Sequence, residues 1–137
     1  MHLLAGDTGR IDDGDAAVDL GQSPGDIIVL SSADSELAAL GAAAARRAAG
    51  APTVRLANLM RLAHPLSVDL YLDRTVAKAS LVVVRMMGGA GYWSYGLDRL
   101  RAMARAGGPL LVAVPGEDRW DPGLEKASSP PVESRYR

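Results

Sequence analysis

The side chains that could do acid–base or metal chemistry are few in this chain of 137 residues. It contains two histidines and no cysteine, which excludes thiolate nucleophiles, disulfides and cysteine-ligated zinc or iron–sulfur sites. His64 is the histidine best placed to bind a metal or move a proton, but it directly precedes Pro65 and is expected to cap a helix there. We predict no metal site, and no serine–histidine–aspartate set can be assembled around a single well-placed histidine.

A glycine-rich turn, Gly88-Gly89-Ala90-Gly91, follows a strongly apolar run. The backbone N–H groups of such a turn can bind an anion. The turn lacks the Lys-Ser/Thr pair of a Walker A loop and the spacing of a dinucleotide fingerprint, so a tight strand-to-helix turn is the alternative. Three of the six aromatic residues follow at once, at Tyr92, Trp93 and Tyr95. Their rings are expected either to form a contact surface for a flat ligand or another domain, or to pack in the core.

Charged groups near the predicted strands give two further candidates. Arg85 lies inside an apolar run, where a guanidinium needs an acidic partner, and Asp34 or Asp7 is expected to supply it. The acidic cluster at residues 12–15 lacks the alternating ligands of a calcium-binding loop and is predicted to be a solvated turn.

Apolar runs alternate with helical periodicity along the chain, which is typical of βαβ units and a parallel sheet. The runs predict strands over residues 2–6, 26–32, 53–58, 81–87 and 109–115. The periodicity predicts helices over residues 34–49, 65–79 and 97–104. We therefore expect an α/β fold with an open, mainly parallel five-stranded sheet and helices on both faces, a flavodoxin- or Rossmann-like three-layer sandwich.

Two segments do not follow the βα alternation. Residues 7–25 hold too few apolar residues for a normal crossover helix; we favour a short helix near residues 15–20 over an irregular loop. Residues 117–137 are rich in proline, serine and charge without apolar period, and are predicted to be a linker or the start of a further domain. The α/β domain is expected to span residues 1–116.

The carboxyl ends of parallel strands meet at one edge of the sheet, and ligands bind there at the switch in strand order. The residues expected at this edge, as ligand or interface contacts, are Asp7, Ser31, Asp34, Asn58, His64, Arg85, Gly88, Gly89, Tyr92 and Trp93. A purely structural role is the alternative, because loops and helix starts favour polar residues in any such fold. No catalytic residue is identified.

The charge balance and the lengths of the apolar runs exclude several partners. Fifteen basic and sixteen acidic residues give a net charge of −1, with no basic block to bind a nucleic-acid backbone. The apolar runs fall far short of the roughly 20 residues that a membrane helix needs, and no signal-peptide pattern begins the chain. We expect a cytoplasmic protein that binds neither nucleic acid nor membrane.

Three stretches of the sequence together resemble a known family. They are MHLLAGDTGRIDDGDAAVDLGQSPGDIIVLSSADSELAAL, RLANLMRLAHPLSVDLYLDRTVAKASLVVVRMMGGAGYWSYGLDRL and LLVAVPGEDRWDPGL. The chain resembles, from Met1 to about Ala127, the N-terminal region of the large subunit of aerobic, ATP-dependent cobaltochelatases, relatives of the magnesium-chelatase large subunit. The most specific parts are residues 19–37, 64–71 and 85–96.

The resemblance implies a role in cobalamin biosynthesis. Such enzymes insert Co²⁺ into hydrogenobyrinic acid a,c-diamide with ATP hydrolysis, and the large subunit works with an AAA+ ATPase and a second partner subunit. No family catalytic residue can be matched to a position here, so this segment is expected to be a scaffold that is not catalytic alone and holds no cofactor. The alternative is a free-standing flavodoxin-like module that binds a small ligand or another protein without catalysis.

Overall fold

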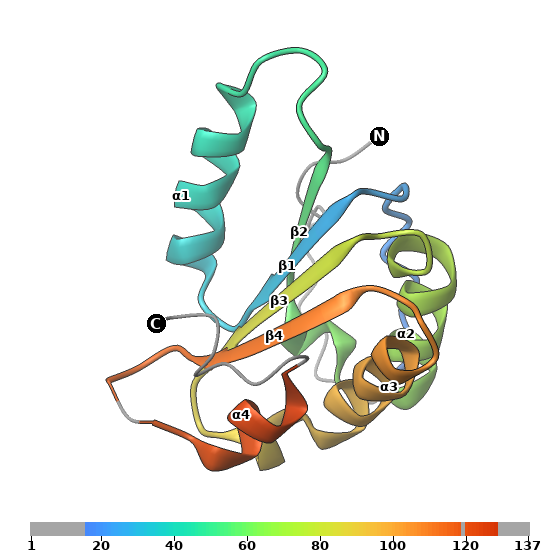
Figure 1. Ribbon diagram of the computed structural model, residues 1–137, viewed down its shortest axis with the longest axis vertical. Helices are drawn as coiled ribbons and strands as arrows, with labels where there is room; N and C mark the ends of the chain where they lie inside the picture. Colours follow the sequence, from blue (N-terminus) through green and yellow to red (C-terminus); the bar gives the residue numbers. More distant parts are fainter. Residues whose placement is uncertain (1–15, 119, 129–137) are drawn as a thin grey trace.

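The computed structural model describes residues 16–118 and 120–128, which form a parallel sheet with flanking helices (Figure 1). The sheet order is β2-β1-β3-β4, and all neighbouring strands are parallel. The strands are β1 (Ile27–Ser31), β2 (Val54–Asn58), β3 (Leu81–Met86) and β4 (Leu110–Pro115). The α/β class is confirmed, but the described sheet has four strands and not five. The strand expected at residues 2–6 lies outside the described residues.

Helical segments follow each strand. They are α1 (Asp34–Ala45), the 3₁₀ turn η1 (Leu59–Leu62), α2 (Pro65–Tyr71), the π-helical turn η2 (Leu72–Val76), the 3₁₀ turn η3 (Ala90–Trp93), α3 (Ser94–Arg105) and α4 (Pro122–Ala127). α1 ends four residues before the predicted end at residue 49. Leu37 is its one buried residue, and a helix whose later turns bury little apolar surface gains little from continuing.

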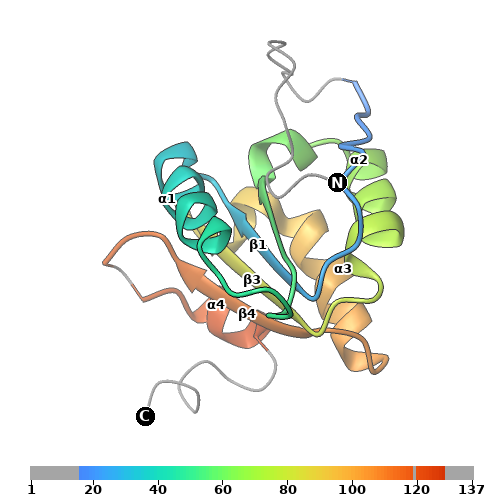
Figure 2. The ribbon, with the colours of Figure 1, turned by 90° about the horizontal axis from the view of Figure 1, so that it is seen from above.

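Helices cover the two faces of the sheet unequally. Figure 2 shows α1 on one side of the strands and α2 and α3 on the other. This division follows from right-handed crossovers, because the chain moves from β1 to β2 in one direction and from β2 to β3 and β4 in the other. We call the face covered by α2 and α3 the closed face. It carries Ile28, Leu30, Val82, Val84, Met86, Leu111 and Ala113.

We call the other side the open face, and its side chains come from the intervening strand positions. They are Ile27, Val29, Leu81, Val83, Leu110, Val112 and Val114. α1 contacts β2 and β1 on this side, where Leu37 and Leu56 are buried.

The main hydrophobic core lies against the closed face. The predicted apolar stripe of the second helix packs there, since its members are all buried: Val68, Tyr71, Leu72, Thr75, Val76 and Ala79. Leu97 and Leu100 of α3 belong to the same cluster. This part of the predicted core is therefore confirmed.

Both edges of the described sheet are capped by side chains. The Gln22 side-chain amide donates to the Leu56 carbonyl on β2 at 3.1 Å. The Ser128 hydroxyl accepts from the Ala113 backbone N–H at 2.7 Å and donates to its carbonyl at 3.2 Å. Such caps satisfy strand groups that would otherwise be free to pair with another chain.

Two expectations for the connecting segments are wrong. Residues 16–20 form no helix, and Ser67 accepts a hydrogen bond from the Val18 backbone at 2.7 Å. α4 lies within the range predicted as a linker, and its Leu124 is fully buried. Asp121 caps α4 by accepting from the Gly123 backbone at 2.8 Å, and Pro122 favours a helix start.

A candidate aromatic pocket at the carboxyl edge of the sheet

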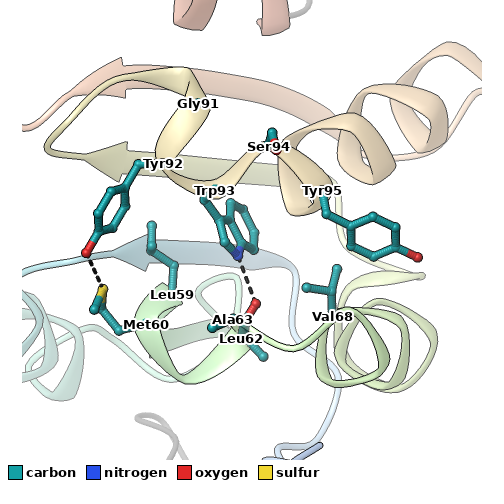
Figure 3. Close-up of a pocket in the computed structure, with 10 residues that line it drawn as sticks. All are labelled: Leu59, Met60, Leu62, Ala63, Val68, Gly91, Tyr92, Trp93, Ser94 and Tyr95. Carbon is teal, nitrogen blue, oxygen red and sulfur yellow. Dashed lines mark hydrogen bonds between the residues drawn. The ribbon is translucent and has the colours of Figure 1, made fainter. Parts of the chain in front are cut away.

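A pocket of about 350 Å³ lies between the segment that follows β2 and the segment that follows β3 (Figure 3). It is lined by Leu59, Met60, Leu62, Ala63, Val68, Gly91, Tyr92, Trp93, Ser94 and Tyr95. Because β1 lies between β2 and β3, the two segments face each other across the carboxyl end of the central strand. The pocket is thus near the sheet edge where α/β proteins bind ligands.

Trp93 anchors the inner wall of this pocket. Its indole is 6% exposed, and its Nε1 donates to the Leu62 carbonyl at 2.9 Å. The ring packs against Gly96, where a Cβ would lie 2.2 Å from the ring. Trp93 therefore lines the pocket as a core residue that ties η3 to η1, which fits the core-packing alternative for this ring.

Two exposed tyrosines form the rim of the pocket. Tyr92 is 55% exposed, and its hydroxyl donates to the Met60 sulfur at 3.2 Å. Tyr95 is 40% exposed, and its hydroxyl donates to the Asp69 carboxylate at 2.8 Å. This hydrogen bond raises the pKa of Tyr95, because only the protonated hydroxyl can donate it. The Nε of Arg99 lies 3.1 Å from the same carboxylate oxygen.

The groups that line this pocket are suited to bind a ligand or a side chain. The walls are aliphatic and aromatic, and the hydroxyls of both rim tyrosines are engaged with neighbours. The lining residues place no nucleophile beside a general base. Exposed aromatic faces above an apolar floor are suited to stack a flat group or to seat an apolar side chain.

The glycine turn beside the pocket binds carboxylates of its own chain. Gly88 and Gly89 have φ angles of +87° and +83°, which favour glycine. The Gly88 N–H donates to Glu117 at 3.3 Å, and the Ala90 N–H donates to Asp121 at 3.1 Å. A phosphate would have to displace these carboxylates, so the tight-turn alternative fits better than the anion cradle. The Asp121-Pro122 pair is the sequence signal for this role of Asp121, which was not among the predicted site residues.

Arg85, Ser31 and Glu36 form a separate cluster at the ends of β3 and β1. Ser31 donates to Glu36 Oε1 at 2.9 Å, and Arg85 Nε lies 3.2 Å from that oxygen. Of the two predicted partners of Arg85, Asp34 is therefore wrong: Glu36, within the first turn of α1, reaches it. Asp34 instead accepts from the Asn58 side chain at 2.8 Å, and Asp7 lies outside the described residues.

His64 and Asn58 cap helical turns. His64 Nδ1 accepts from the Leu66 N–H at 3.1 Å, which confirms the predicted cap before Pro65. Asn58 accepts from the Met60 N–H at 2.9 Å and so fixes the turn that presents Met60 to the pocket. Met60 is a pocket residue that was not predicted from the sequence. An isolated methionine in an apolar stretch gives no signal for such a role.

The described residues bring together no group of three or more His, Asp or Glu side chains that could hold a metal ion. No helix in the described ranges is long and apolar enough to cross a bilayer.

Comparison with known proteins gives a consistent result. The chain is 47% identical over all 137 residues to an aerobic cobaltochelatase subunit CobN from a Sinorhizobium species, and 40% identical to the subunit of the same name from Pseudomonas aeruginosa. It spans 11% of the length of each of these relatives. No family model matches the chain.

A solved structure described as the catalytic subunit of cobaltochelatase from Mycobacterium tuberculosis is similar over 79% of this chain, with a TM-score of 0.57 and 30% identity. The match covers 8% of that chain. The sequence similarity and the fold similarity therefore point to the same kind of protein.

Proposed function

We propose that this chain is the N-terminal scaffold domain of the large subunit of a cobaltochelatase in cobalamin biosynthesis. The observation that carries the proposal is the similarity of all 137 residues to two subunits with this name. The similar solved structure supports it, since its title names a cobaltochelatase catalytic subunit. The whole enzyme, a relative of the magnesium chelatases, would insert Co²⁺ into hydrogenobyrinic acid a,c-diamide with ATP hydrolysis.

We assign the metal-insertion chemistry to the remainder of such a subunit. Two arguments support this division. The relatives are about nine times as long as this chain, and the described residues gather no metal-ligand cluster. The partners of this segment are then the rest of the large subunit and, in the cytoplasmic complex, an AAA+ ATPase and a second subunit.

The aromatic pocket is the part of the scaffold that we place at the edge of the enzyme's cleft. Tyr92, Tyr95 and Met60 are exposed, and the turns that carry them are fixed by Trp93 and Asn58 through hydrogen bonds. Exposed apolar groups on rigid turns are suited to recognition, because little side-chain and loop entropy is lost when they bind.

A free-standing binding module is the second candidate, and the same pocket favours it. A cavity of about 350 Å³ is within the range of small-molecule sites. The two candidates differ in what the isolated chain does. A self-sufficient module binds a small ligand by itself, whereas a scaffold segment works only within the long subunit.

The decisive experiment replaces the matching segment of the Sinorhizobium subunit with these 137 residues and measures cobalt insertion by the assembled complex. We expect the fusion to be active and a subunit without the segment to be inactive or unable to assemble. Equal activity of the subunit with and without the segment would contradict the scaffold role.

Calorimetry of the isolated chain with corrin, nucleotide and Co²⁺ tests the second candidate. Tight binding of one of them, abolished by Tyr92→Ala, would favour the free-standing module. Whether the reading frame continues beyond Arg137 is a simpler test. Continuation into a long subunit would support the scaffold, and a stop codon would support the module.

A further inference from the structure

The open face of the sheet presents an aliphatic surface that the described helices leave partly bare. Leu110 is 49% exposed. Five of the other six side chains on this face are only partly buried, and Val112 is buried. The partly buried ones are Ile27, Val29, Leu81, Val83 and Val114. On the closed face, the corresponding positions Ile28, Leu30, Val82, Val84 and Leu111 are fully or almost fully buried.

The topology explains why the described chain leaves this surface bare. α1 reaches the open face through the crossover from β1 to β2, and its main strand contacts there are with these two strands. The later crossovers run in the opposite direction and place α2 and α3 on the closed face. α4 packs against β4, and its Leu124 and Ala127 join the closed-face core. No described element after α1 can therefore cover the open face over β3 and β4.

We propose that this surface is the docking site for an amphipathic helix from the part of the large subunit outside these 137 residues. The inference rests on the proposed function, because it takes the helix from the same long polypeptide. Parallel sheets are almost always covered on both faces, and the relatives carry about nine times the length of this chain. The last described residue also lies beside this region, since Ser128 is hydrogen-bonded to Ala113 on the outer edge of β4.

The surface also specifies the chemistry of the helix. Its contact stripe must be aliphatic, because the open face over β3 and β4 offers Leu and Val side chains. Helices that cover a parallel sheet run antiparallel to the strands, so the N-terminus of this helix lies at the end that carries Arg85. The Arg85 side chain is 43% exposed beyond its pairing with Glu36. An Asp or Glu in the first turn of the helix would pair with Arg85 and would also suit the helix dipole.

Site-specific thiol labelling tests the proposal, because the chain has no cysteine of its own. Leu110→Cys places a thiol on the open face, and Ala102→Cys places one on the exposed side of α3 as a control. Maleimide labelling of each position is followed by mass spectrometry, both in the isolated chain and in the fusion with the remainder of the Sinorhizobium subunit. We expect labelling at 110 to be about tenfold slower in the fusion, with position 102 unchanged.

Three other outcomes would overturn the proposal. Equal labelling at position 110 in both proteins would show that nothing covers the face in the fusion. Equal slowing at positions 110 and 102 would show that protection is not specific to the open face. Slow labelling in the isolated chain that speeds up on dilution would show that a second copy of the chain covers it. Cobalt insertion by the same fusion is measured as well, because it tests the scaffold function separately. If the fusion is active but position 110 is unprotected, only the docking helix is refuted.

Discussion

The two faces of this sheet are built from the same strands and nearly the same residue types, yet they differ in how they are covered. In β3, Val82 and Val84 of the closed face are almost fully buried, whereas Leu81 and Val83 of the open face are partly exposed. The difference does not arise from hydrophobicity, since all four side chains are aliphatic. It arises from the direction of the crossovers, which places two of the three longer helices on one side.

The two faces of the sheet therefore differ in role: the closed face stabilises the isolated chain, and the open face is the one proposed to contact another segment. The closed face carries a continuous core that includes the pocket wall at Trp93. The open face contributes less to the free energy of unfolding of the isolated chain, because less of its apolar area is removed from water. Substitutions on the closed face should therefore destabilise the isolated chain, and under the docking proposal those on the open face should act mainly on contacts with the remainder of the large subunit.

The largest effect is expected from Trp93→Ala. It removes a buried indole and its hydrogen bond to Leu62, and we expect the free energy of unfolding to fall by about 3–5 kcal/mol. Trp120→Ala is the matched control, since Trp120 is 53% exposed. Urea denaturation of both variants measures the difference. Equal stability losses would contradict the assignment of Trp93 to the core.

Two adjacent valines in β3 compare the faces directly. Val84→Ala on the closed face should cost about 2–3 kcal/mol in the isolated chain, from lost burial and a cavity. Val83→Ala on the open face should cost less than about 1 kcal/mol, because its side chain is only partly buried. Urea denaturation of both variants measures the two losses. In the fusion with the long subunit, the loss caused by Val83→Ala should increase. A constant small loss would count against a covering helix.

β1, β3 and β4 could be predicted because each is mainly a run of aliphatic residues, which is typical of a parallel sheet. The same continuous apolar pattern does not show that the two faces of the sheet differ in burial. A run such as Leu81–Met86 predicts burial on both sides and does not show which crossover helices will cover it. That information lies in the strand order, which depends on contacts between residues far apart in the sequence.

The site could be predicted only in part for a similar reason. His64 before Pro65 is a local signal, and its cap is confirmed. The partner of Arg85 depends on how α1 is placed over the strand ends, so Glu36 could not be distinguished from Asp34. The burial of Trp93 depends on the lack of a side chain at Gly96, three residues away, and on the Leu62 carbonyl from another segment. The clustering of Tyr92, Trp93 and Tyr95 in the sequence predicted where the rim of the pocket lies, but it did not predict the buried inner wall.

A smaller effect is expected at the edge between the two faces. Ser128→Ala removes both hydrogen bonds to Ala113, and we expect a loss of about 1–2 kcal/mol. Hydrogen exchange should also accelerate at the Ala113 amide. Ser32→Ala serves as the control, because Ser32 accepts only a long, exposed hydrogen bond from Met87 at 3.3 Å. Unchanged exchange at Ala113 would show that the hydroxyl does not protect this edge.

A small effect at neutral pH, about 1 kcal/mol, is expected from Tyr71→Phe, which removes the hydrogen bond from Tyr71 to Gln22 at 2.6 Å. Burial raises the pKa of Tyr71 above the ordinary value of 10.0. The unfolded chain therefore loses this proton first as the pH rises. The stability linked to Tyr71 is fully present below pH 10 and is lost as the pH rises towards the pKa of the folded state.

Tyr71→Phe should consequently flatten the decline in unfolding free energy above about pH 10, measured by urea denaturation across that range. Val83→Ala on the open face shifts the whole curve without changing its slope, because it alters no titratable group. An unchanged alkaline slope in Tyr71→Phe would show that burial in the closed-face core does not control this tyrosine. The pH dependence would then no longer distinguish the two faces.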